Sequence, residues 1–451
     1  MPSRMRSCVQ GRAVDEFIGI LTLLRKDRGL MRAIRLGQTA LAMALTTAAL
    51  CGDAQAQSAF ATLFDFGAPV SPTNLIAGPN GVLYGAANNA VFGGAVFQLT
   101  PPAAPGQAWN MTVLYTLTDS HGESPAAIVL GRGGAIFGTT NLGGGPANAG
   151  MVFELTPPAT AGGNWTLQIP HIFGGFPDGN GPSGSLAVGP NGEIYGATTH
   201  GGVSPIGSGT VFAVTPPATT GGSWTETILY RFTGGADGAL PVGGVVLGPD
   251  GFLYGTTAEG GAFGFGTVFQ LRPPLTPGAG WTEAVLYSFG GGFDGSYPEA
   301  VVLPGPNGRL YGTTRTGGTA ETGFNGDGTV FELKPPPKGA GAWIEDIIYR
   351  FQPGFPTVGY YPTAPVVMGA NGAIYGTTCC GGTVYGVVFE LQPPISPGGA
   401  WTETVLHTFL GGADSGSPYQ GLLIGPGGVL YGTTTGIGTS AESATIFAVE
   451  P

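Results

Sequence analysis

The sequence predicts an all-β protein whose tandem repeats close into a ring, and three observations lead to this prediction. The 451 residues include 85 Gly and 39 Pro, a density that breaks helices but permits short apolar runs between turns. The six tryptophans recur at intervals of 56 to 62 residues in the same local pattern, which indicates a repeated supersecondary unit. The last copy lacks its final segment, and a matching segment stands alone at residues 58–66.

Each copy is predicted to form four short strands. In the fourth copy, the four apolar runs are GGVVLG at 243–248, FLYGTT at 252–257, GTVFQL at 266–271 and WTEAVLYSF at 281–289. None reaches helical length, and turn chemistry separates them. The Pro-Asp-Gly turn at 249–251 ends the first run, and Pro273-Pro274 ends the third because proline cannot donate to a strand ladder. We therefore expect a four-stranded antiparallel meander.

Seven copies of this meander predict a seven-bladed β-propeller of four-stranded antiparallel blades. The copies are counted at the centre of the second strand, where an aromatic residue precedes glycine: Tyr84, Phe137, Tyr195, Tyr254, Tyr311, Tyr375 and Tyr431. One small sheet cannot bury both faces, so neighbouring sheets must cover each other. An open β-solenoid is the alternative architecture. It explains the period of the repeat but not the split last copy.

The segment SAFATLFDF, residues 58–66, is predicted to supply the missing fourth strand of the last copy, which stops at ATIFAVEP. In this arrangement Phe64 and Phe66 take the places that Tyr287 and Phe289 hold in the fourth copy. An open ring would leave an unpaired strand edge, which invites aggregation. We therefore expect the first strand of the mature chain to close the ring.

The first 56 residues are predicted to be removed from the mature protein. Residues 31–56 contain Arg32 and Arg35, an apolar run at 39–50 and the small-residue site Ala54-Gln55-Ala56, which together are typical of a secretory signal peptide. A membrane anchor is the weaker alternative because the run is shorter than the roughly 20 residues that a span requires. Residues 1–30 are interpreted as an upstream extension from a mis-assigned start codon. Residues 57–451 would then form one secreted or periplasmic propeller domain.

The charge and cysteine content exclude several partners. After residue 56 the chain keeps 8 Lys and Arg against 23 Asp and Glu, a formal net charge of −15. Nucleic acids and anionic bilayers both require a basic surface, so we expect no nucleic-acid binding and no membrane insertion after signal cleavage.

Only Cys379 and Cys380 remain after residue 56, so disulfides do not hold the fold together. We expect a monomer.

The pattern GPDGFLYGTTAEGGAFGFGTVFQL at 248–271, followed by WTEAVLYSFGGGFDG at 281–295, resembles the GloVer (Gloeo-Verruco, "choice-of-anchor") tandem repeat of exported bacterial proteins. The resemblance covers residues 58–451. The first two strands are more distantly similar to NHL and senescence-marker-type propellers. The resemblance implies an exported propeller and no particular activity. Related proteins often end in an anchoring segment, whereas this sequence ends at Val449-Glu450-Pro451, which favours release over surface attachment.

Five aspartates follow the fourth strands and are the candidate ligand-binding residues: Asp119, Asp178, Asp237, Asp294 and Asp414. In a meander, the connections that carry them lie on one rim of the ring, together with the loops between second and third strands. Carboxylates around one mouth could accept hydrogen bonds from sugar hydroxyls or hold Ca²⁺. The simpler interpretation is that Asp-Gly only makes a turn. No other cofactor is predicted.

The remaining polar and aromatic features are expected to have structural roles. The Thr256-Thr257 pair and its equivalents end a β-branched strand, and the tryptophans are expected to pack between sheets. His171 and His407 lie in fourth strands, where a packing role outweighs metal ligation. Cys379-Cys380 are interpreted as small loop residues, with a vicinal disulfide or a reactive thiol as the alternatives.

Two classes of function remain. The first is a non-catalytic binding or scaffold propeller that recognises a glycan or a protein through one loop rim. The second is an extracellular enzyme, either a metal-dependent lactonase or a glycan-cleaving enzyme, with a site built from rim loops. The seven inner strands carry one polar amide, Asn74, and no acid or base, while general acid-base catalysis requires titratable groups that converge. We therefore expect no catalytic residues in the channel wall and favour the binding function.

Overall fold

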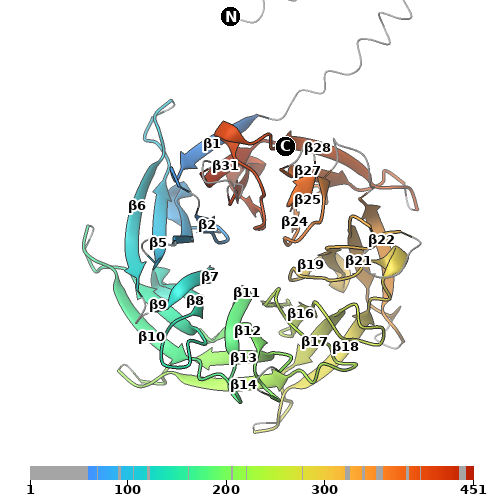
Figure 1. The fold of residues 1–451 in the computed structure, drawn as a ribbon, viewed down its shortest axis with the longest axis horizontal. Helices are drawn as coiled ribbons and strands as arrows, with labels where there is room; N and C mark the ends of the chain where they lie inside the picture. The colour runs from blue at the N-terminus through green and yellow to red at the C-terminus, as the bar shows by residue number, and fades with distance from the viewer. Residues whose placement is uncertain are drawn as a thin grey trace, which may run out of the picture. The chain divides into compact units, whose positions relative to one another are not determined.

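Seven antiparallel sheets surround a central axis (Figure 1). The computed structural model describes residues 59–451 except 69, 90–92, 105, 119–121, 161, 205–206, 220, 277, 320–325, 338–340, 352–358, 382–384, 397 and 436–442. The predicted extension at 1–30, the predicted signal peptide at 31–56 and Asp119 lie outside the described residues.

The strands of the first four units follow the predicted order. They are, unit by unit: β2 (Ser71–Pro72), β3 (Ile76–Ala77), β4 (Leu83–Asn89), β5 (Gly93–Thr100) and β6 (Asn110–Leu117); β7 (Glu123–Leu130), β8 (Ile136–Leu142), β9 (Met151–Thr156) and β10 (Thr166–Ile172); β11 (Asn180–Val188), β12 (Ile194–His200), β13 (Thr210–Thr215) and β14 (Thr225–Arg231); β15 (Val245–Leu247), β16 (Leu253–Thr257), β17 (Thr267–Arg272) and β18 (Thr282–Ser288).

The last three units are built in the same way. Their strands are: β19 (Leu303–Pro304), β20 (Leu310–Thr314), β21 (Thr329–Lys334) and β22 (Ile344–Arg350); β24 (Val367–Met368), β25 (Ile374–Thr378), β27 (Val387–Gln392) and β28 (Thr402–Thr408), with the added pair β23 (Gly359–Tyr360) and β26 (Cys380–Gly381); β29 (Leu423–Ile424), β30 (Leu430–Thr433), β31 (Thr445–Val449) and β1 (Phe60–Asp65). The helices in the described part of the chain are single 3₁₀ turns, and none is long or apolar enough to cross a membrane.

Chain order is strand order within a sheet, as a meander requires. The fourth unit runs β15-β16-β17-β18 from the axis outward, and all four strands fall within or one residue beyond the four runs predicted from the sequence. The all-β prediction is confirmed.

The ring is closed by pairing between the two ends of the described chain. The last sheet has the order β1-β31-β30-β29, and β1 is antiparallel to β31 with Phe60 opposite Val449 and Phe64 opposite Ile446. The pairing of Phe64 with Ile446 matches that of Tyr287 with Val268 in the fourth unit. The seven-bladed propeller closed by the strand at 58–66 is therefore confirmed, and the open solenoid is excluded.

Phe66 repeats the contacts of its counterpart Phe289. The backbone N–H of Phe66 donates to the carbonyl of Ala444 at 3.0 Å, and its ring meets Phe97 of the first unit edge-on at 5.7 Å. Phe289 makes the same edge contact with Phe331 of the next unit at 5.2 Å. The first strand is thus packed as a regular fourth strand.

Tryptophans pack between units, as the sequence predicts. Trp281 at the start of β18 meets Tyr195 of the preceding unit edge-on, with the ring centroids 5.9 Å apart. Trp109 of the first unit makes the equivalent contact with Tyr431 of the last unit at 6.2 Å. The repeated aromatic contact therefore continues across the closure of the ring.

Small residues in the second strand make room for the core. A Cβ on Gly255 would lie 2.5 Å from the Phe269 ring on the neighbouring strand, so glycine is required there for close approach. The threonines that follow are buried: the Thr256 hydroxyl donates to the Ala300 carbonyl of the next unit at 2.9 Å, and Thr257 shares a hydrogen bond with Thr267 at 2.8 Å. Their predicted structural role is confirmed.

Deletion of residues 58–66 is expected to destabilise the whole ring. Phe66→Ala alone should reduce the free energy of unfolding by about 1.5–3 kcal/mol because an apolar ring leaves the closure core. Chemical denaturation of the purified protein measures this effect. Phe263→Ala, at a loop side chain that is 64% exposed, is the control and should change little. Equal stability of the deletion variant and the full chain would contradict the closure argument.

Candidate functional site

The described candidate aspartates lie in the loops after fourth strands, and each accepts hydrogen bonds from its own loop and strand. Asp237 accepts from the backbone N–H of Thr233 at 2.8 Å and from the hydroxyl of Tyr230 at 3.1 Å. Donors four and seven residues earlier serve the other aspartates in the same way, at Asp178, Asp294 and Asp414. These bonds account for a role in the turn. A role of the aspartates in ligand or Ca²⁺ binding stays a prediction.

In the four strands that lead to described aspartates, β10, β14, β18 and β28, a β-bulge precedes the Tyr or His that contacts the aspartate. In β18 the register shifts so that Tyr287 pairs with Val268 while Val285 pairs with Phe269. The bulge leaves one residue unpaired and changes the direction in which the next side chain points. Comparable shifts occur in β6, β10, β14, β22 and β28.

A glutamate from the following unit faces each of three aspartates across the boundary between units. We call each set of a Tyr or His, an Asp and a Glu a junction cluster; the three are His171, Asp178 and Glu226, then Tyr230, Asp237 and Glu283, then Tyr287, Asp294 and Glu345. These glutamates were not among the candidate residues predicted from the sequence. A sequence signal for these glutamates does exist: the tripeptide Trp-Thr-Glu or Trp-Ile-Glu recurs at the starts of fourth strands.

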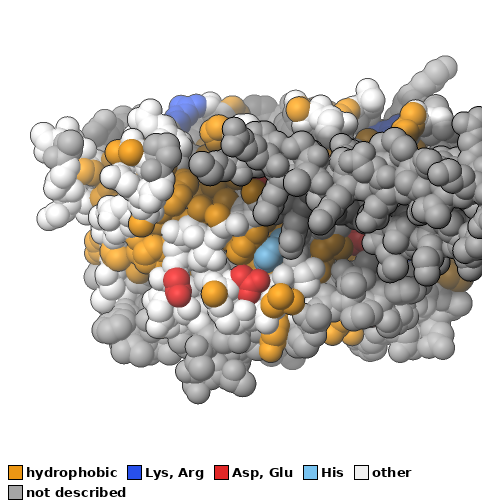
Figure 2. All heavy atoms as spheres, turned by 90° about the horizontal axis from the view of Figure 1, so that it is seen from above, with side chains coloured by type: hydrophobic (Ala, Val, Ile, Leu, Met, Phe, Trp, Pro, Cys, Tyr) orange, Lys and Arg blue, Asp and Glu red, His pale blue; other side chains and the backbone are white. Residues whose placement is uncertain are grey.

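Burial raises the pKa of all three junction glutamates and so favours their protonated form. Burial raises the pKa of Glu283 to about 7 and that of Glu345 to about 8, and the charges of Asp237 and Asp294 add to these shifts. One carboxyl oxygen of each glutamate is buried with no hydrogen-bond partner among the described residues. A neutral carboxyl is cheaper to bury than a carboxylate. Figure 2 shows acidic side chains and a histidine close together among hydrophobic side chains on one side of the molecule.

A separate cavity of about 420 Å³ opens at the central axis. Residues at or just before the inner strands of all seven units line it, including Asn74, Ala127, Ser185, Gly243, Ala300, Pro365 and Gln420. Its size falls within the usual range for small-ligand sites. We call this cavity the channel mouth.

An acid lines the channel mouth, so the expectation of a wall without titratable groups is wrong. Glu299 lies two residues before the inner run VVLPG, and therefore outside the inner strand itself. It accepts a hydrogen bond from Arg315 at 3.0 Å. The Arg315 guanidinium lies 5.9 Å from the centre of the Tyr361 ring, and Tyr419 also lines the cavity. The lining of the mouth therefore combines an ion-paired carboxylate, Glu299, with one aromatic side chain, Tyr419.

The two cysteines lie beside the same arginine. Their sulfur atoms are 2.9 Å apart, both thiols are free, and Cys379 is buried. The pKa of Cys380 is lowered to about 7, chiefly because of its hydrogen bond with the Cys379 thiol; burial opposes this shift, and the Arg315 charge adds a smaller lowering contribution. The pKa of Cys379 is raised because it is the donor and is buried. Cys380 is therefore the more acidic thiol of the pair; whether it is reactive or the two cysteines are simply small loop residues stays a prediction.

The family of the protein is evident from its repeats. The model of the Gloeobacter/Verrucomicrobia repeat matches residues 71–325 and 275–451. The chain belongs to this family. The predicted GloVer resemblance is thereby confirmed across all seven units of the ring. No curated protein sequence matches the chain.

Solved structures similar to this Gloeobacter/Verrucomicrobia repeat protein are distant in sequence. Virginiamycin B lyase from Staphylococcus aureus, crystallised with quinupristin, is 13% identical with a TM-score of 0.52 and covers 87% of this chain and 100% of its own. A protein described as a candidate phosphogluconolactonase from Bacteroides uniformis is 15% identical with a TM-score of 0.46, covering 73% of this chain and 83% of its own. The NanB sialidase from Streptococcus pneumoniae is 11% identical with a TM-score of 0.39, covering 87% and 70%. The first of these likenesses shows the fold alone.

We expect the stability of the repeat protein to fall as pH rises. The pKa of each carboxyl is higher in the folded state, about 7 for Glu283 and about 8 for Glu345, than its ordinary value of 4.5. Such a carboxyl stabilises the folded state fully below pH 4.5. It loses this contribution as the pH rises through the folded pKa. The Tm of the wild type should decrease between about pH 5 and pH 9. Replacing Glu283 and Glu345 with Gln should make this decrease smaller by about 1–3 °C per site. Differential scanning calorimetry over this pH range measures the Tm values.

The exposed Glu450→Gln variant is the control for this titration and should keep the wild-type slope. A wild-type Tm that rises from pH 5 to pH 8, or a double variant with an unchanged slope, would contradict the assignment of protonated junction glutamates.

Cys380 should react with iodoacetamide at neutral pH while Cys379 stays unmodified, because only Cys380 has a lowered pKa. Mass spectrometry of digested protein locates the label. Arg315→Gln should slow the reaction at pH 7 and shift its half-maximal rate to higher pH, since the arginine charge favours the thiolate. Preferential labelling of Cys379 would show that the hydrogen bond between the thiols runs the other way.

Proposed function

We propose that this protein is an exported, non-catalytic binding propeller that holds the end of a glycan in its channel mouth. The observation that carries the proposal is the cavity of about 420 Å³ lined by residues of all seven units. Its backbone and side chains offer donors and acceptors from many directions, which is the arrangement that fixes a ligand with several hydroxyl groups.

The aromatic side chains support a sugar ligand. Tyr419 lines the cavity and is 45% exposed, so the face of its ring is accessible. Asn74 and Gln420 line the same cavity and can both donate and accept hydrogen bonds. An amphipathic sugar ring suits such a combination of an aromatic face and polar amides.

The state of Glu299 favours binding over catalysis. Its carboxylate already accepts a hydrogen bond from Arg315, and an ion-paired carboxylate is a poor general acid. A lactonase or a glycan-cleaving enzyme, the second class of function, would need Glu299 to act with another rim group. The same ligand screen, followed by assay for product, distinguishes the two classes.

The proposed site of action lies outside the cytoplasm. The signal-like sequence at 31–56 and the formal net charge of −15 after residue 56 support release into the periplasm or the medium. Detection of the mature chain with Gln57 at its N-terminus in the exported fraction would support this location, and an uncleaved cytoplasmic chain would contradict it.

A glycan array on the purified protein tests the proposal. Tyr419→Ala and Gln420→Ala should each weaken binding by about tenfold because each removes a stacking or hydrogen-bonding surface from the mouth. Leu275→Ala is the matched control: this fully exposed residue lies in the connection between third and fourth strands, away from the residues that line the mouth. It should bind as the wild type does.

Two further arms separate the alternatives. Asp237→Ala with Asp294→Ala, and a calcium chelator, test whether the aspartates and Ca²⁺ contribute. Absence of binding to every glycan, or binding that survives the channel-mouth substitutions, would overturn the proposal. Release of a cleaved product would replace it with the enzyme.

A further inference from the structure

We propose that His171, Asp178 and Glu226 form a binding site for a divalent first-row transition ion, with Zn²⁺ as the ion that best suits the three ligands. One ligand atom from each residue lies within 4.8 Å of the other two. The site is independent of the channel mouth, and it joins the second unit of the ring to the third.

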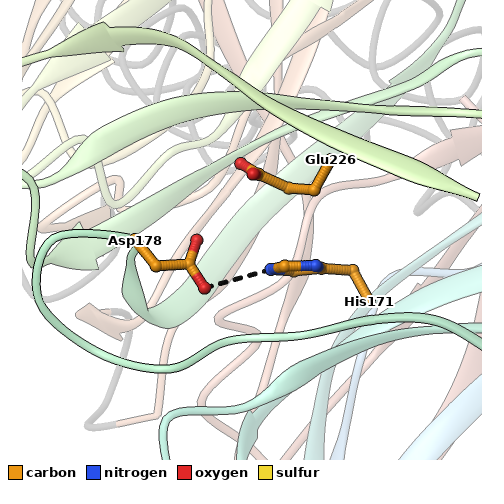
Figure 3. Close-up of side chains that lie close together, drawn as sticks. All are labelled: His171, Asp178 and Glu226. Carbon is orange, nitrogen blue, oxygen red and sulfur yellow. Dashed lines mark hydrogen bonds and ion pairs between the residues drawn. The ribbon is translucent and has the colours of Figure 1, made fainter.

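The fold brings the three ligands together from two units. His171 lies near the end of β10, Asp178 lies in the loop that follows, and Glu226 lies at the start of β14 (Figure 3). The outer strands β10 and β14 contact each other, so the end of one meets the start of the other. Figure 3 shows the two carboxyl groups and the imidazole ring directed at a common space.

The distances suit a small cation. The His171 Nε2 atom is 3.1 Å from the Asp178 Oδ2 atom, and two ligands held about 2.1 Å from a tetrahedral zinc lie about 3.4 Å apart. The Glu226 ligand atom lies within 4.8 Å of the other two, so it has to move by at most about 1.4 Å to reach the tetrahedral spacing. His171 and Asp178 are 19% and 22% exposed, so an ion can reach the site from solvent.

Two oxygens in the cluster have no partner. Asp178 Oδ1 and Glu226 Oε1 are buried and make no hydrogen bond with any described residue, while Asp178 Oδ2 accepts from both His171 and the backbone N–H of Gly174. Buried carboxyl oxygens without partners are costly. A cation bound between the two carboxyl groups would offset the cost of burying these oxygens and would cancel the repulsion between the two acids.

The other junctions show what makes this one suitable for a metal. Strand register places Tyr230 and Tyr287 where this junction has His171, and a tyrosine hydroxyl is a poorer zinc ligand than imidazole. At the junction of the sixth and seventh units, His407 and Asp414 keep the pair at 3.1 Å. There Phe60 takes the place of the glutamate and stacks on His407 at 3.6 Å. In the described part of the chain, this is the one place where His, Asp and Glu meet.

The ligand set selects the class of ion. Imidazole nitrogen with two carboxylates favours Zn²⁺ and its first-row neighbours, whereas Ca²⁺ and Mg²⁺ prefer six or more oxygen ligands. Three protein ligands leave at least one coordination position for water. The predicted packing role holds for both fourth-strand histidines, since His171 meets Phe173 edge-on at 4.7 Å and His407 meets Phe409 at 4.8 Å; in this proposal His171 is also a ligand.

Isothermal titration of the metal-stripped, untagged protein with Zn²⁺ tests the site. A Cys379→Ser, Cys380→Ser background keeps thiolates from competing for the ion. We expect one equivalent of Zn²⁺, a Tm that rises with zinc concentration, and the visible spectrum of nitrogen- and oxygen-ligated Co²⁺ when cobalt replaces zinc.

The repeats supply matched variants that preserve the fold. His171→Tyr and Glu226→Leu introduce the residues that other units carry at these positions, as in Tyr230 and Leu167. Each should weaken zinc binding by more than about 100-fold. His407→Tyr is the control and should leave the one equivalent unchanged.

A gain of function gives the sharpest test. Tyr230→His adds the missing imidazole beside Asp237 and Glu283, so the stoichiometry should rise from one equivalent to two. Absence of zinc binding in the parent protein, or binding that His171→Tyr leaves intact, would overturn the site and leave Asp178 as a turn residue that hydrogen-bonds its own loop.

Discussion

The antiparallel pairing of β1 with β31 is the constraint on which the rest of this structure depends. It joins residues about 390 positions apart in the sequence and turns a row of sheets into a ring, so every sheet has two neighbours to cover its faces. Without it the last sheet would lack its outer strand and the first would lose the aromatic contacts of Phe66. Because closure fixes the seven inner strands around one axis, it also creates the channel mouth.

Repetition gives the ring two kinds of position. Some residues must be the same in every unit because the packing is the same: the glycine beside the core phenylalanine, represented by Gly255 and Phe269, has no room for a side chain. Positions at the junctions between units tolerate change, since Tyr, His or Phe can all follow the strand bulge. The same backbone can therefore hold a proton-sharing carboxyl at one junction and a candidate metal site at another.

The two candidate sites use buried charge differently. In the channel mouth, Glu299 is neutralised by Arg315, so the cavity is polar without a strong field. In the junction clusters no arginine or lysine forms a salt bridge with the described glutamates at 226, 283 and 345, and burial raises the pKa of all three carboxyls. Because the protein has few basic residues, few carboxyls between its sheets can form an ion pair with Lys or Arg. Protonation is then the way in which a buried carboxyl avoids the cost of its charge.

The sequence by itself determined the repeat, the strand content, the number of blades and the closure of the ring, because glycine, proline and apolar patterning act locally and the split copy leaves one solution. It also placed the aspartates in loops. Only the tertiary structure decided which side chains meet. Glu226 and Asp178 are 48 positions apart in the sequence, and Glu299 and Tyr419 belong to different units, so their proximity follows from how the sheets are arranged around the ring. Strand periodicity carries no information about contacts between units, which is why the glutamates and the channel acid were not predicted.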